Sequence, residues 1–244
     1  MTASIVKVDP VVRRGDNVCL SRGEYRILKG SATFMTSTPT ITALIVAAGV
    51  GARAGGERPK QYQEIAGKPM IRHSIEAFLA HPRIGAVQVV IHPEHANDYA
   101  EAMAGLTLLP PIHGGAERSD SVKAGLAALA DQIPDYVLIH DAARPFLSAS
   151  VIDRIVEALT PETGVVPTLG VYDTVRRYRD GVWEDVSREG LQRIQTPQAF
   201  PFGALTEIYA KGAFATDDAA LWLAAGRVLK YVQGDEALNK MTTA

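Results

Sequence analysis

The 244-residue sequence has few of the features that would tie it to a membrane, a metal cluster or a nucleic acid. Its single cysteine, Cys19, makes an intramolecular disulfide impossible and argues against a cysteine-based zinc site. Lys and Arg total 25 and Asp and Glu total 27, so the net charge of −2 does not draw the chain to nucleic acid or anionic membranes. No apolar run reaches the roughly 18 residues that a membrane-spanning helix needs. We therefore expect a cytoplasmic globular protein in which any anionic ligand is held by locally clustered bases.

Common catalytic signatures are missing as well. There is no Gly-Lys-Ser/Thr sequence of a P-loop and no Gly-x-Ser-x-Gly nucleophile elbow. The six histidines show no metal-binding spacing beyond His92-Pro93-Glu94-His95, which we interpret as structural. Phosphate chemistry on a P-loop, serine hydrolysis on an elbow and zinc chemistry are therefore not indicated.

Residues 1–38 differ in composition from the rest of the chain. They carry scattered charges, do not form a secretory signal, and end in a polar run directly before the first convincing strand. We expect an N-terminal extension that is poorly ordered and carries no chemistry, with the functional domain at residues 39–244. The alternative is a short docked β-structure from Val18 to Ile27.

From residue 41 onward strand and helix signals alternate, which is typical of an α/β fold. We expect a Rossmann-like, mainly parallel sheet with helices on both faces and a projecting β-hairpin arm. The apolar run Ile41–Ala47 indicates a buried parallel strand. Strands are also expected at 86–91, 106–112, 136–140, 164–168 and 228–232, and helices at 70–80, 95–103, 119–130, 151–159, 202–209 and 217–225.

The pattern changes at about residues 170–192. Two polar, strand-like runs lie on either side of Arg179-Asp180-Gly181, and Asp-Gly between such runs is a strong hairpin signal. Because the runs contain few apolar residues, the hairpin is expected to project from the core. A projecting hairpin needs something to pack on, and we expect a second copy of the chain, which gives a homodimer.

The loop after the first strand, residues 47–62, combines small residues with bases. Small residues at the carboxyl end of a strand let backbone N–H groups approach a phosphate. Arg53, Arg58 and Lys60 could neutralise a polyphosphate. Gly49, Gly51 and Ala54 fit a relaxed dinucleotide-binding pattern, but a loop follows in place of the required helix. A nucleoside triphosphate loop and a surface loop with solvated charges remain as interpretations, with Arg58 expected to face solvent.

Two further loops could belong to the same site. Gly114-Gly115-Ala116-Glu117-Arg118-Ser119-Asp120-Ser121 precedes a helix and could hold a base or ribose, while Ser119 or Asp120 could simply cap the helix. His140-Asp141-Ala142-Ala143-Arg144-Pro145 ends a strand. There Asp141 could hold Mg²⁺ and Arg144 could bind a second anion, or the two could form a plain salt bridge.

Together these loops resemble the 2-C-methyl-D-erythritol 4-phosphate cytidylyltransferases of the non-mevalonate isoprenoid pathway. The resemblance extends from Ile41 to nearly the end of the sequence. It is carried by AAGVGAR (47–53), PKQY (59–62), GGAERSDSV (114–122), HDAARP (140–145), YDTV (172–175), TPQAF (196–200), ATDDA (215–219) and LNK (238–240).

The resemblance implies transfer of CMP from CTP to methylerythritol phosphate, with Mg²⁺ or another divalent cation as cofactor. Arg53 and Lys60 would stabilise charge at the α-phosphate, together with Arg188 and Lys240 as catalytic residues, and Asp141 would lie near the metal-bound triphosphate. The expected CTP contacts are Ala47, Ala48, Gly49, Gly51, Gly115, Ala116, Ser121 and Asp141. The expected acceptor contacts are Arg144, Thr174, Arg188, Thr196 and Lys240.

The phosphate monoester acceptor has a second pKa of about 6, so it needs no general base at neutral pH. The chain departs from the family at Ala54 and Ala116, where larger residues are common, and it ends where the family continues into a final helix. We expect a fragment, possibly of a bifunctional protein with a cyclodiphosphate synthase domain. A related transferase acting on ribitol phosphate and a non-catalytic nucleotide-binding subunit are the alternatives.

Overall fold

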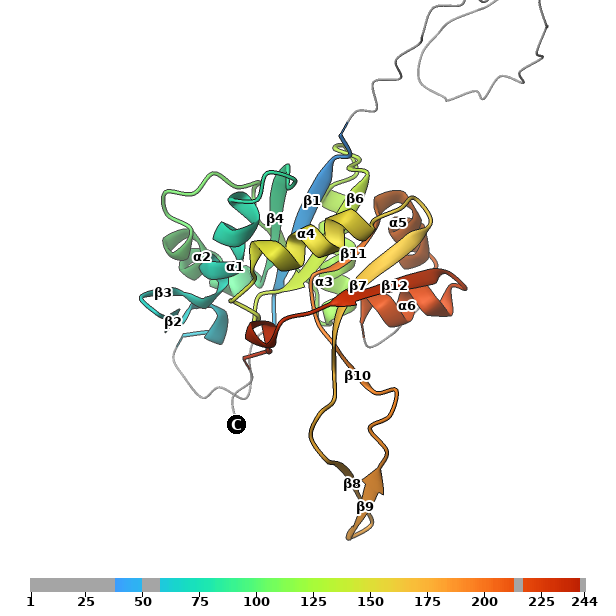
Figure 1. The fold of residues 1–244 in the computed structure, drawn as a ribbon. Coiled ribbons are helices and arrows are strands. Elements are labelled where there is room, and N and C mark those ends of the chain that lie inside the picture. The colour runs from blue at the N-terminus through green and yellow to red at the C-terminus, as the bar shows by residue number, and fades with distance from the viewer. Residues whose placement is uncertain (1–37, 50–57, 213–216, 242–244) are drawn as a thin grey trace, which may run out of the picture. The chain divides into compact units, whose positions relative to one another are not determined.

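The computed structural model describes residues 38–49, 58–212 and 217–241. Residues 1–37 of the expected N-terminal extension, and the site candidates Gly51, Arg53 and Ala54, therefore lie outside the described residues. Figure 1 shows the described elements. They are β1 (Ile41–Ala47), η1 (Lys60–Tyr62), β2 (Glu64–Ile65), β3 (Lys68–Pro69), α1 (Met70–Leu79), β4 (Ala86–Ile91), η2 (Pro93–His95), α2 (Ala96–Ala102), β5 (Ile112–His113), α3 (Arg118–Ala128), β6 (Tyr136–Asp141), α4 (Ala149–Ala158), β7 (Thr163–Gly170), β8 (Val175–Arg179), β9 (Val182–Val186), β10 (Gln192–Ile194), β11 (Gln198–Pro201), α5 (Phe202–Ala210), α6 (Asp218–Ala224), β12 (Val228–Gln233) and η3 (Glu236–Leu238).

The central sheet is mainly parallel, as the sequence predicts. Its strand order is β10-β7-β11-β6-β1-β4-β5, with β12 paired to β7. Strand β1 runs parallel to both β4 and β6, so Ala47 lies beside Ile91 and Val46 beside Asp141. Strand β11 is antiparallel to β6. The carboxyl ends of β1, β4 and β6 therefore meet at one edge, where α/β sheets bind ligands.

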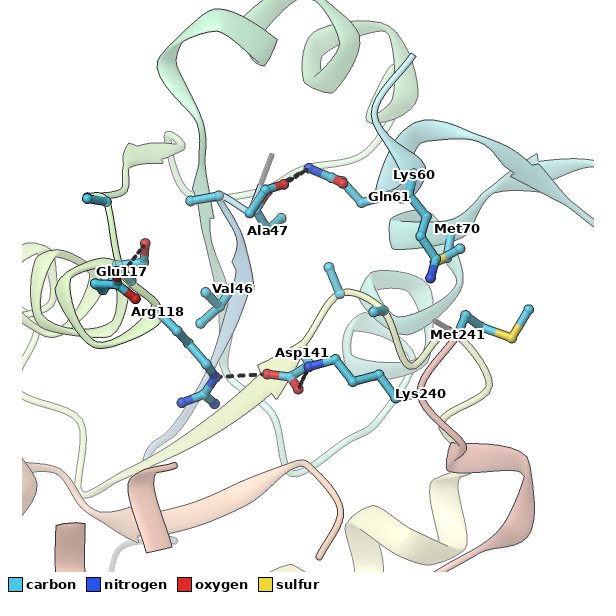
Figure 2. A pocket seen from close by; sticks show the side chains of 17 residues that line it. Val46, Ala47, Lys60, Gln61, Met70, Glu117, Arg118, Asp141, Lys240 and Met241 are labelled. Atoms are coloured by element: carbon cyan, nitrogen blue, oxygen red, sulfur yellow. Dashed lines mark hydrogen bonds and ion pairs between the residues drawn. The ribbon is translucent and has the colours of Figure 1, made fainter. Parts of the chain in front are cut away.

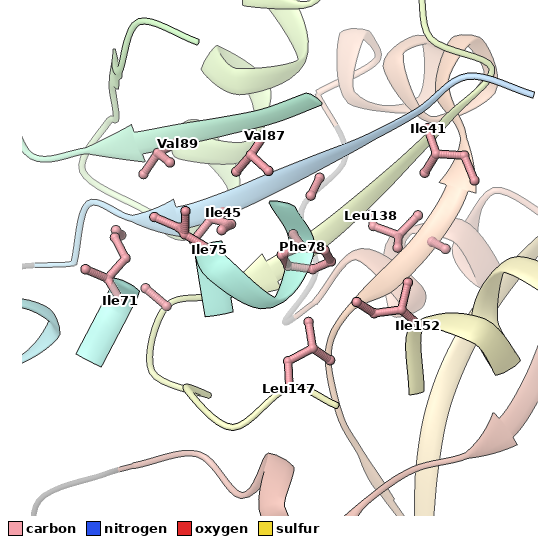
Figure 3. Packing of buried hydrophobic residues seen from close by; sticks show 14 of the residues in the cluster. Ile41, Ile45, Ile71, Ile75, Phe78, Val87, Val89, Leu138, Leu147 and Ile152 are labelled. Carbon is pink, nitrogen blue, oxygen red and sulfur yellow. The ribbon is translucent and has the colours of Figure 1, made fainter. Parts of the chain in front are cut away.

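The core lies on both faces of the sheet, because β1 alternates its side chains between them. Ile45 packs with residues of α1 and α4, including Ile75, Phe78 and Ile152 (Figure 3). Leu44 packs on the opposite face with residues of α3, α5 and α6. This alternation with a period of two explains why an uninterrupted apolar run forms a strand buried on both faces.

The expected hairpin is present. Strands β8 and β9 pair only with each other in the described part of the chain, and Asp180 and Gly181 form their turn with positive φ angles of 51° and 84°. Positive φ at both central positions is the requirement of the favoured hairpin turn. The aromatic rings of Tyr178 and Trp183 stack 5.0 Å apart, and both residues are exposed.

Two local predictions were wrong. The strand expected at 106–112 is reduced to Ile112–His113, because Pro110 and Pro111 cannot donate backbone hydrogen bonds to a ladder. The cap of α3 is Glu117, not Ser119 or Asp120, although the Asp120 carboxylate accepts a hydrogen bond from the Glu117 N–H at 3.2 Å. None of the helices in the described ranges is long and apolar enough to cross a membrane.

Candidate active site

A cavity of about 320 Å³ lies at the edge where β1 and β6 end (Figure 2). It brings together many of the residues that the sequence singles out, from segments far apart in the chain. Its lining consists of Val46, Ala47, Ala48, Gly49, Lys60, Gln61, Met70, Gly115, Ala116, Glu117, Arg118, Ser121, Asp141, Ala142, Ala143, Lys240 and Met241.

A buried glutamine, Gln61, holds the end of the first loop against the end of strand β1. The side-chain amide of Gln61 donates to the carbonyl of Ala47 at 2.8 Å and to that of Gly49 at 3.1 Å. These bonds fix η1 beside the end of β1, so the preceding residue, Lys60, extends into the cavity (Figure 2). Burial and the charge of Lys240 lower the pKa of Lys60 from its ordinary value. Two ammonium groups are therefore held near each other, an arrangement that favours an anionic ligand.

The second loop packs directly against the first. A Cβ at Gly114 would lie 2.4 Å from the Cβ of Ala48, so only glycine permits this approach. Gly115 and Ala116 then line the cavity, and α3 begins at Arg118. The Ser121 hydroxyl donates to the Glu117 carbonyl at 3.2 Å. The cavity wall is thus largely backbone with small side chains, which suits the flat surface of a base or ribose.

Asp141 stands between two cations. Its Oδ1 accepts from Arg118 Nε at 3.0 Å, and its Oδ2 accepts from Lys240 Nζ at 3.0 Å. Burial alone would raise the pKa of Asp141, but the charges and hydrogen bonds of Arg118 and Lys240 outweigh it and hold that pKa well below its usual range. The carboxylate is therefore ionised at every physiological pH.

Sequence reasoning missed the role of Arg118. Its Nη2 donates to Asp218 Oδ2 at 2.8 Å, and Asp218 is completely buried in the first turn of α6. Arg118 thus connects the cavity to an internal carboxylate 100 residues away in the chain. Both residues lie within the motifs that carry the family resemblance, which was the available signal, but nothing in the sequence pairs them.

Arg144 and Thr196 are not among the residues that line the cavity. Arg144 Nη1 donates to the Leu238 carbonyl at 2.6 Å, and its Nε lies 3.9 Å from Asp141 Oδ2. The Thr196 hydroxyl accepts from the Asp141 N–H at 3.1 Å and lies 3.1 Å from Nδ1 of the buried His140. Both residues therefore support the segment around Asp141, residues 140–144. The Arg144 contact agrees with the salt bridge that the sequence left open as an alternative, whereas the supporting role of Thr196 was not predicted.

Thr174 and Arg188 belong to the arm and are also absent from the cavity lining. Both are exposed, and the Arg188 guanidinium donates to the Tyr172 carbonyl. Within one copy of the chain, the structure does not bring these two residues together with Lys60, Asp141 and Lys240.

Arg58 lies at the surface, with its side chain 35% exposed, but it is not a free charge. Its Nε pairs with Asp98 at 3.0 Å and its Nη2 with Glu101 at 2.8 Å, both on α2. Arg58 therefore fastens the segment that leads into η1 to a neighbouring helix, two residues before Lys60.

Comparison with known proteins agrees with this geometry. The family model described as 2-C-methyl-D-erythritol 4-phosphate cytidylyltransferase (IspD) matches residues 41–244. The bifunctional enzyme IspD/IspF of Rhodospirillum rubrum is 47% identical over 207 residues, which cover 83% of this chain and 54% of that protein. The corresponding enzyme of Rhizorhabdus wittichii is 49% identical over 213 residues, covering 86% of this chain and 55% of that protein. The chain thus spans about half the length of the curated relatives it matches.

Solved structures show the same relationship. A crystal structure of 4-diphosphocytidyl-2C-methyl-D-erythritol synthase superposes with a TM-score of 0.71 at 32% identity, covering 84% of this chain and 93% of that one. The 2-C-methyl-D-erythritol 4-phosphate cytidylyltransferase of Thermus thermophilus gives a TM-score of 0.69 at 31% identity, covering 82% and 92%. The loops at the edge of this sheet therefore do not belong to a dinucleotide-binding dehydrogenase: the chain belongs to the 2-C-methyl-D-erythritol 4-phosphate cytidylyltransferase family.

Proposed function

We propose that this chain transfers CMP from CTP to 2-C-methyl-D-erythritol 4-phosphate, giving 4-diphosphocytidyl-2-C-methyl-D-erythritol and pyrophosphate. The observation that carries the proposal is the joint presence of Lys60, Asp141 and Lys240 in one cavity walled by two small-residue loops. The family relationship supplies the substrates. The single cysteine, Cys19, fits a reducing cytoplasm, where we propose that the reaction takes place.

Two loops would bind CTP. The described backbone of Ala47, Ala48 and Gly49 would face the ribose and phosphates, with Gly51 following in the same loop. Gly115, Ala116 and Ser121 would hold the cytosine and ribose from the other side. Because the Gly114 turn touches Ala48, the distance between the two loops is fixed before the ligand arrives, which lowers the entropic cost of binding.

The chemistry needs charge stabilisation more than proton transfer. An oxygen of the acceptor phosphate forms a bond to the α-phosphorus of CTP, and the bond from that phosphorus to the departing pyrophosphate breaks. Lys60, which lines the cavity, would stabilise the charge that develops at the α-phosphate, and we assign Arg53 the same task. Lys240 would orient the incoming phosphate once it leaves Asp141.

The residues present are compatible with a divalent cation. Mg²⁺ commonly uses one or two carboxylates and takes its remaining ligands from water and substrate phosphates. Asp141 offers one ionised carboxylate in the cavity, and the described ranges contain no group of three acidic, histidine or cysteine side chains that could hold a metal without substrate. Asp141 would hold the cation, which would neutralise triphosphate charge when bound.

The acceptor would be held by residues from two places. Arg144, Thr196 and Lys240 belong to or support the edge of the cavity, whereas Thr174 and Arg188 belong to the arm. We propose that the arm's residues reach the cavity of a second copy of the chain, so that each acceptor site is completed by the partner. Arg188 would then act at the partner's acceptor phosphate.

Exposed aromatic surface on the arm supports a homodimer. Tyr178 is 61% and Trp183 66% exposed, and both lie on a two-stranded ribbon that is marginal in water on its own. Replacing Trp183 by Glu should convert a dimer to a monomer in light-scattering measurements, whereas Glu184→Gln on the neighbouring position should not. A wild-type monomer at micromolar concentration would contradict this part of the proposal.

Pyrophosphate release with purified protein tests the reaction. We expect release from CTP with 2-C-methyl-D-erythritol 4-phosphate and not with ribitol phosphate. Preference for ribitol phosphate would instead identify a related transferase, and tight CTP binding without turnover on either acceptor would identify a nucleotide-binding subunit.

A further inference from the structure

The buried carboxylate of Asp218 calls for a physical explanation. This side chain has no exposed surface, and it accepts from the Tyr209 hydroxyl at one oxygen and from Arg118 Nη2 at the other, at 2.8 Å. Burying an ion pair is costly, and an apolar pair of similar volume often stabilises a fold as well or better. A contribution to fold stability therefore explains an ionised group at this position poorly. A role toward the cavity explains it better.

Arg118 links this carboxylate to the cavity. Its side chain is 28% exposed and lines the cavity, and its Nε donates to Asp141 Oδ1 at 3.0 Å. The planar guanidinium therefore donates to Asp141 from Nε and to Asp218 from Nη2. One positive charge is shared between two carboxylates, and the buried one is fixed by Tyr209.

Two further cationic side chains, those of Lys240 and Arg144, lie close to Asp141. Lys240 Nζ pairs with Oδ2 at 3.0 Å, and Arg144 Nε lies 3.9 Å from the same oxygen. Because Arg118 is shared and the Lys240 side chain is 46% exposed, the negative potential at Asp141 is only partly offset, and Asp141 can still attract a cation that arrives with a triphosphate. If Asp218 were neutral, Arg118 would pair with Asp141 alone, and that stronger pair would oppose the cation.

We propose that Arg118 and Asp218 are positioning residues for Asp141: the buried carboxylate holds the guanidinium in a shared pairing that leaves Asp141 able to bind a divalent cation. This proposal rests on the proposed function, because it assigns a metal to Asp141. It adds two residues of this chain, on α3 and α6, that act through Asp141 and do not touch the reacting atoms.

Binding of Mn²⁺ to the 244-residue chain tests the proposal without relying on turnover. Because CTP itself chelates Mn²⁺, the free-ion electron paramagnetic resonance signal is compared in CTP solutions with and without protein. The protein-dependent loss of that signal gives the Kd for Mn²⁺ in the presence of CTP. Asp218→Asn should raise this Kd at least tenfold, and Tyr209→Phe should raise it about threefold, because the unsupported carboxylate holds Arg118 less firmly. In the transfer assay, the same Asp218→Asn variant should recover its rate at high metal concentration.

Asp217→Asn is the matched control. Asp217 is the neighbouring carboxylate and caps α6 by accepting from the Ala220 N–H at 2.8 Å, but it makes no contact with Arg118 among the described interactions. Asn caps helices as well as Asp does, so this variant should keep the Mn²⁺ Kd within twofold of wild type. A merely structural role of Asp218 would lower the melting temperature while leaving the metal dependence unchanged.

The possible outcomes are distinct. A folded Asp218→Asn variant with a Mn²⁺ Kd within twofold of wild type would overturn the proposal. If that variant does not fold, Tyr209→Phe decides, and an unchanged Kd there overturns it equally. Wild-type protein that binds Mn²⁺ and CTP without releasing pyrophosphate would contradict the transferase function and leave this comparison of affinities valid. Absence of protein-dependent Mn²⁺ binding in the presence of CTP would contradict both.

Discussion

Replacing Thr196 by Val should destabilise the fold, because the Thr196 hydroxyl joins two groups, the backbone N–H of Asp141 and the side chain of His140. It accepts from the Asp141 N–H at 3.1 Å and lies 3.1 Å from His140 Nδ1. His140 Nε2 lies 2.9 Å from the Arg144 carbonyl, which can only accept, so Nε2 carries the hydrogen and Nδ1 accepts from Thr196.

Valine has nearly the same shape but offers neither bond. It leaves the Asp141 N–H and His140 Nδ1 without partners, and each such buried group costs about 1–3 kcal/mol. Allowing for the gain from a buried methyl group, we expect a loss of about 3 kcal/mol in the free energy of unfolding. For a domain of roughly 200 residues, that loss lowers the Tm by about 6–12 °C.

Urea unfolding followed by circular dichroism measures the change directly. Thr196→Ser keeps the hydroxyl and loses only a methyl group, so it should cost about 1 kcal/mol. A Thr196→Val variant that loses less than 1 kcal/mol, or that behaves like Thr196→Ser, would refute the reasoning. A variant with unchanged stability and a raised KM for the acceptor would show that Thr196 acts through substrate contact alone.

Three further predictions concern activity, pH and packing. Lys60→Ala should lower kcat at least 100-fold in the pyrophosphate assay, as loss of a preorganised electrostatic group does, and a loss below tenfold would remove Lys60 from the mechanism. Burial lowers the pKa of His140 from its ordinary 6.5 to about 4, so stability should be complete above pH 6.5 and fall by about 3 kcal/mol on acidification to pH 4. His140→Gln should flatten this loss in urea unfolding at each pH, and an unchanged slope would exclude His140 as its source. Gly125→Ala adds a Cβ 2.4 Å from Leu44 Cδ1, so overpacking should exceed the helix-propensity gain of about 1 kcal/mol and cost a net 1–2 kcal/mol in thermal unfolding. Its control, Gly203→Ala, meets no atom within 4 Å and should stabilise by about 0.5 kcal/mol.

Sequence reasoning was most successful where the signal is local. The apolar run of β1 and the Asp-Gly turn of the arm each depend on a few adjacent residues, and both were predicted with correct positions. The short strands β2, β3 and β10 were not predicted, because segments of two or three residues become strands only through their pairing partners. Pairing across the sheet leaves no periodic pattern in the sequence.

In the candidate site, too, local features were predicted and long-range pairing was not. Lys60 and Asp141 were predicted to face the ligand because each follows a recognisable strand or loop, and both line the cavity. The pairing of Arg118 with Asp218 was not predicted, because the partners are 100 residues apart and each could equally be a solvated charge. Only the fold shows that Asp218 is fully buried. That burial is the reason for proposing that the pair positions Asp141.

The attachment of residues 238–241 to the Asp141 segment has a consequence for protein synthesis. Arg144 is bonded to the Leu238 carbonyl, the Ala143 carbonyl accepts from the Met241 N–H at 2.8 Å, and Lys240 pairs with Asp141 from 99 residues further along the chain. A nascent polypeptide can therefore assemble β1, β4 and β6 on the ribosome long before Lys240 has been translated. Until residues 238–241 emerge, Asp141 can pair only with Arg118 and, at the longer distance of 3.9 Å, with Arg144. A chain that lacks these residues therefore presents a different charge balance to a nucleotide.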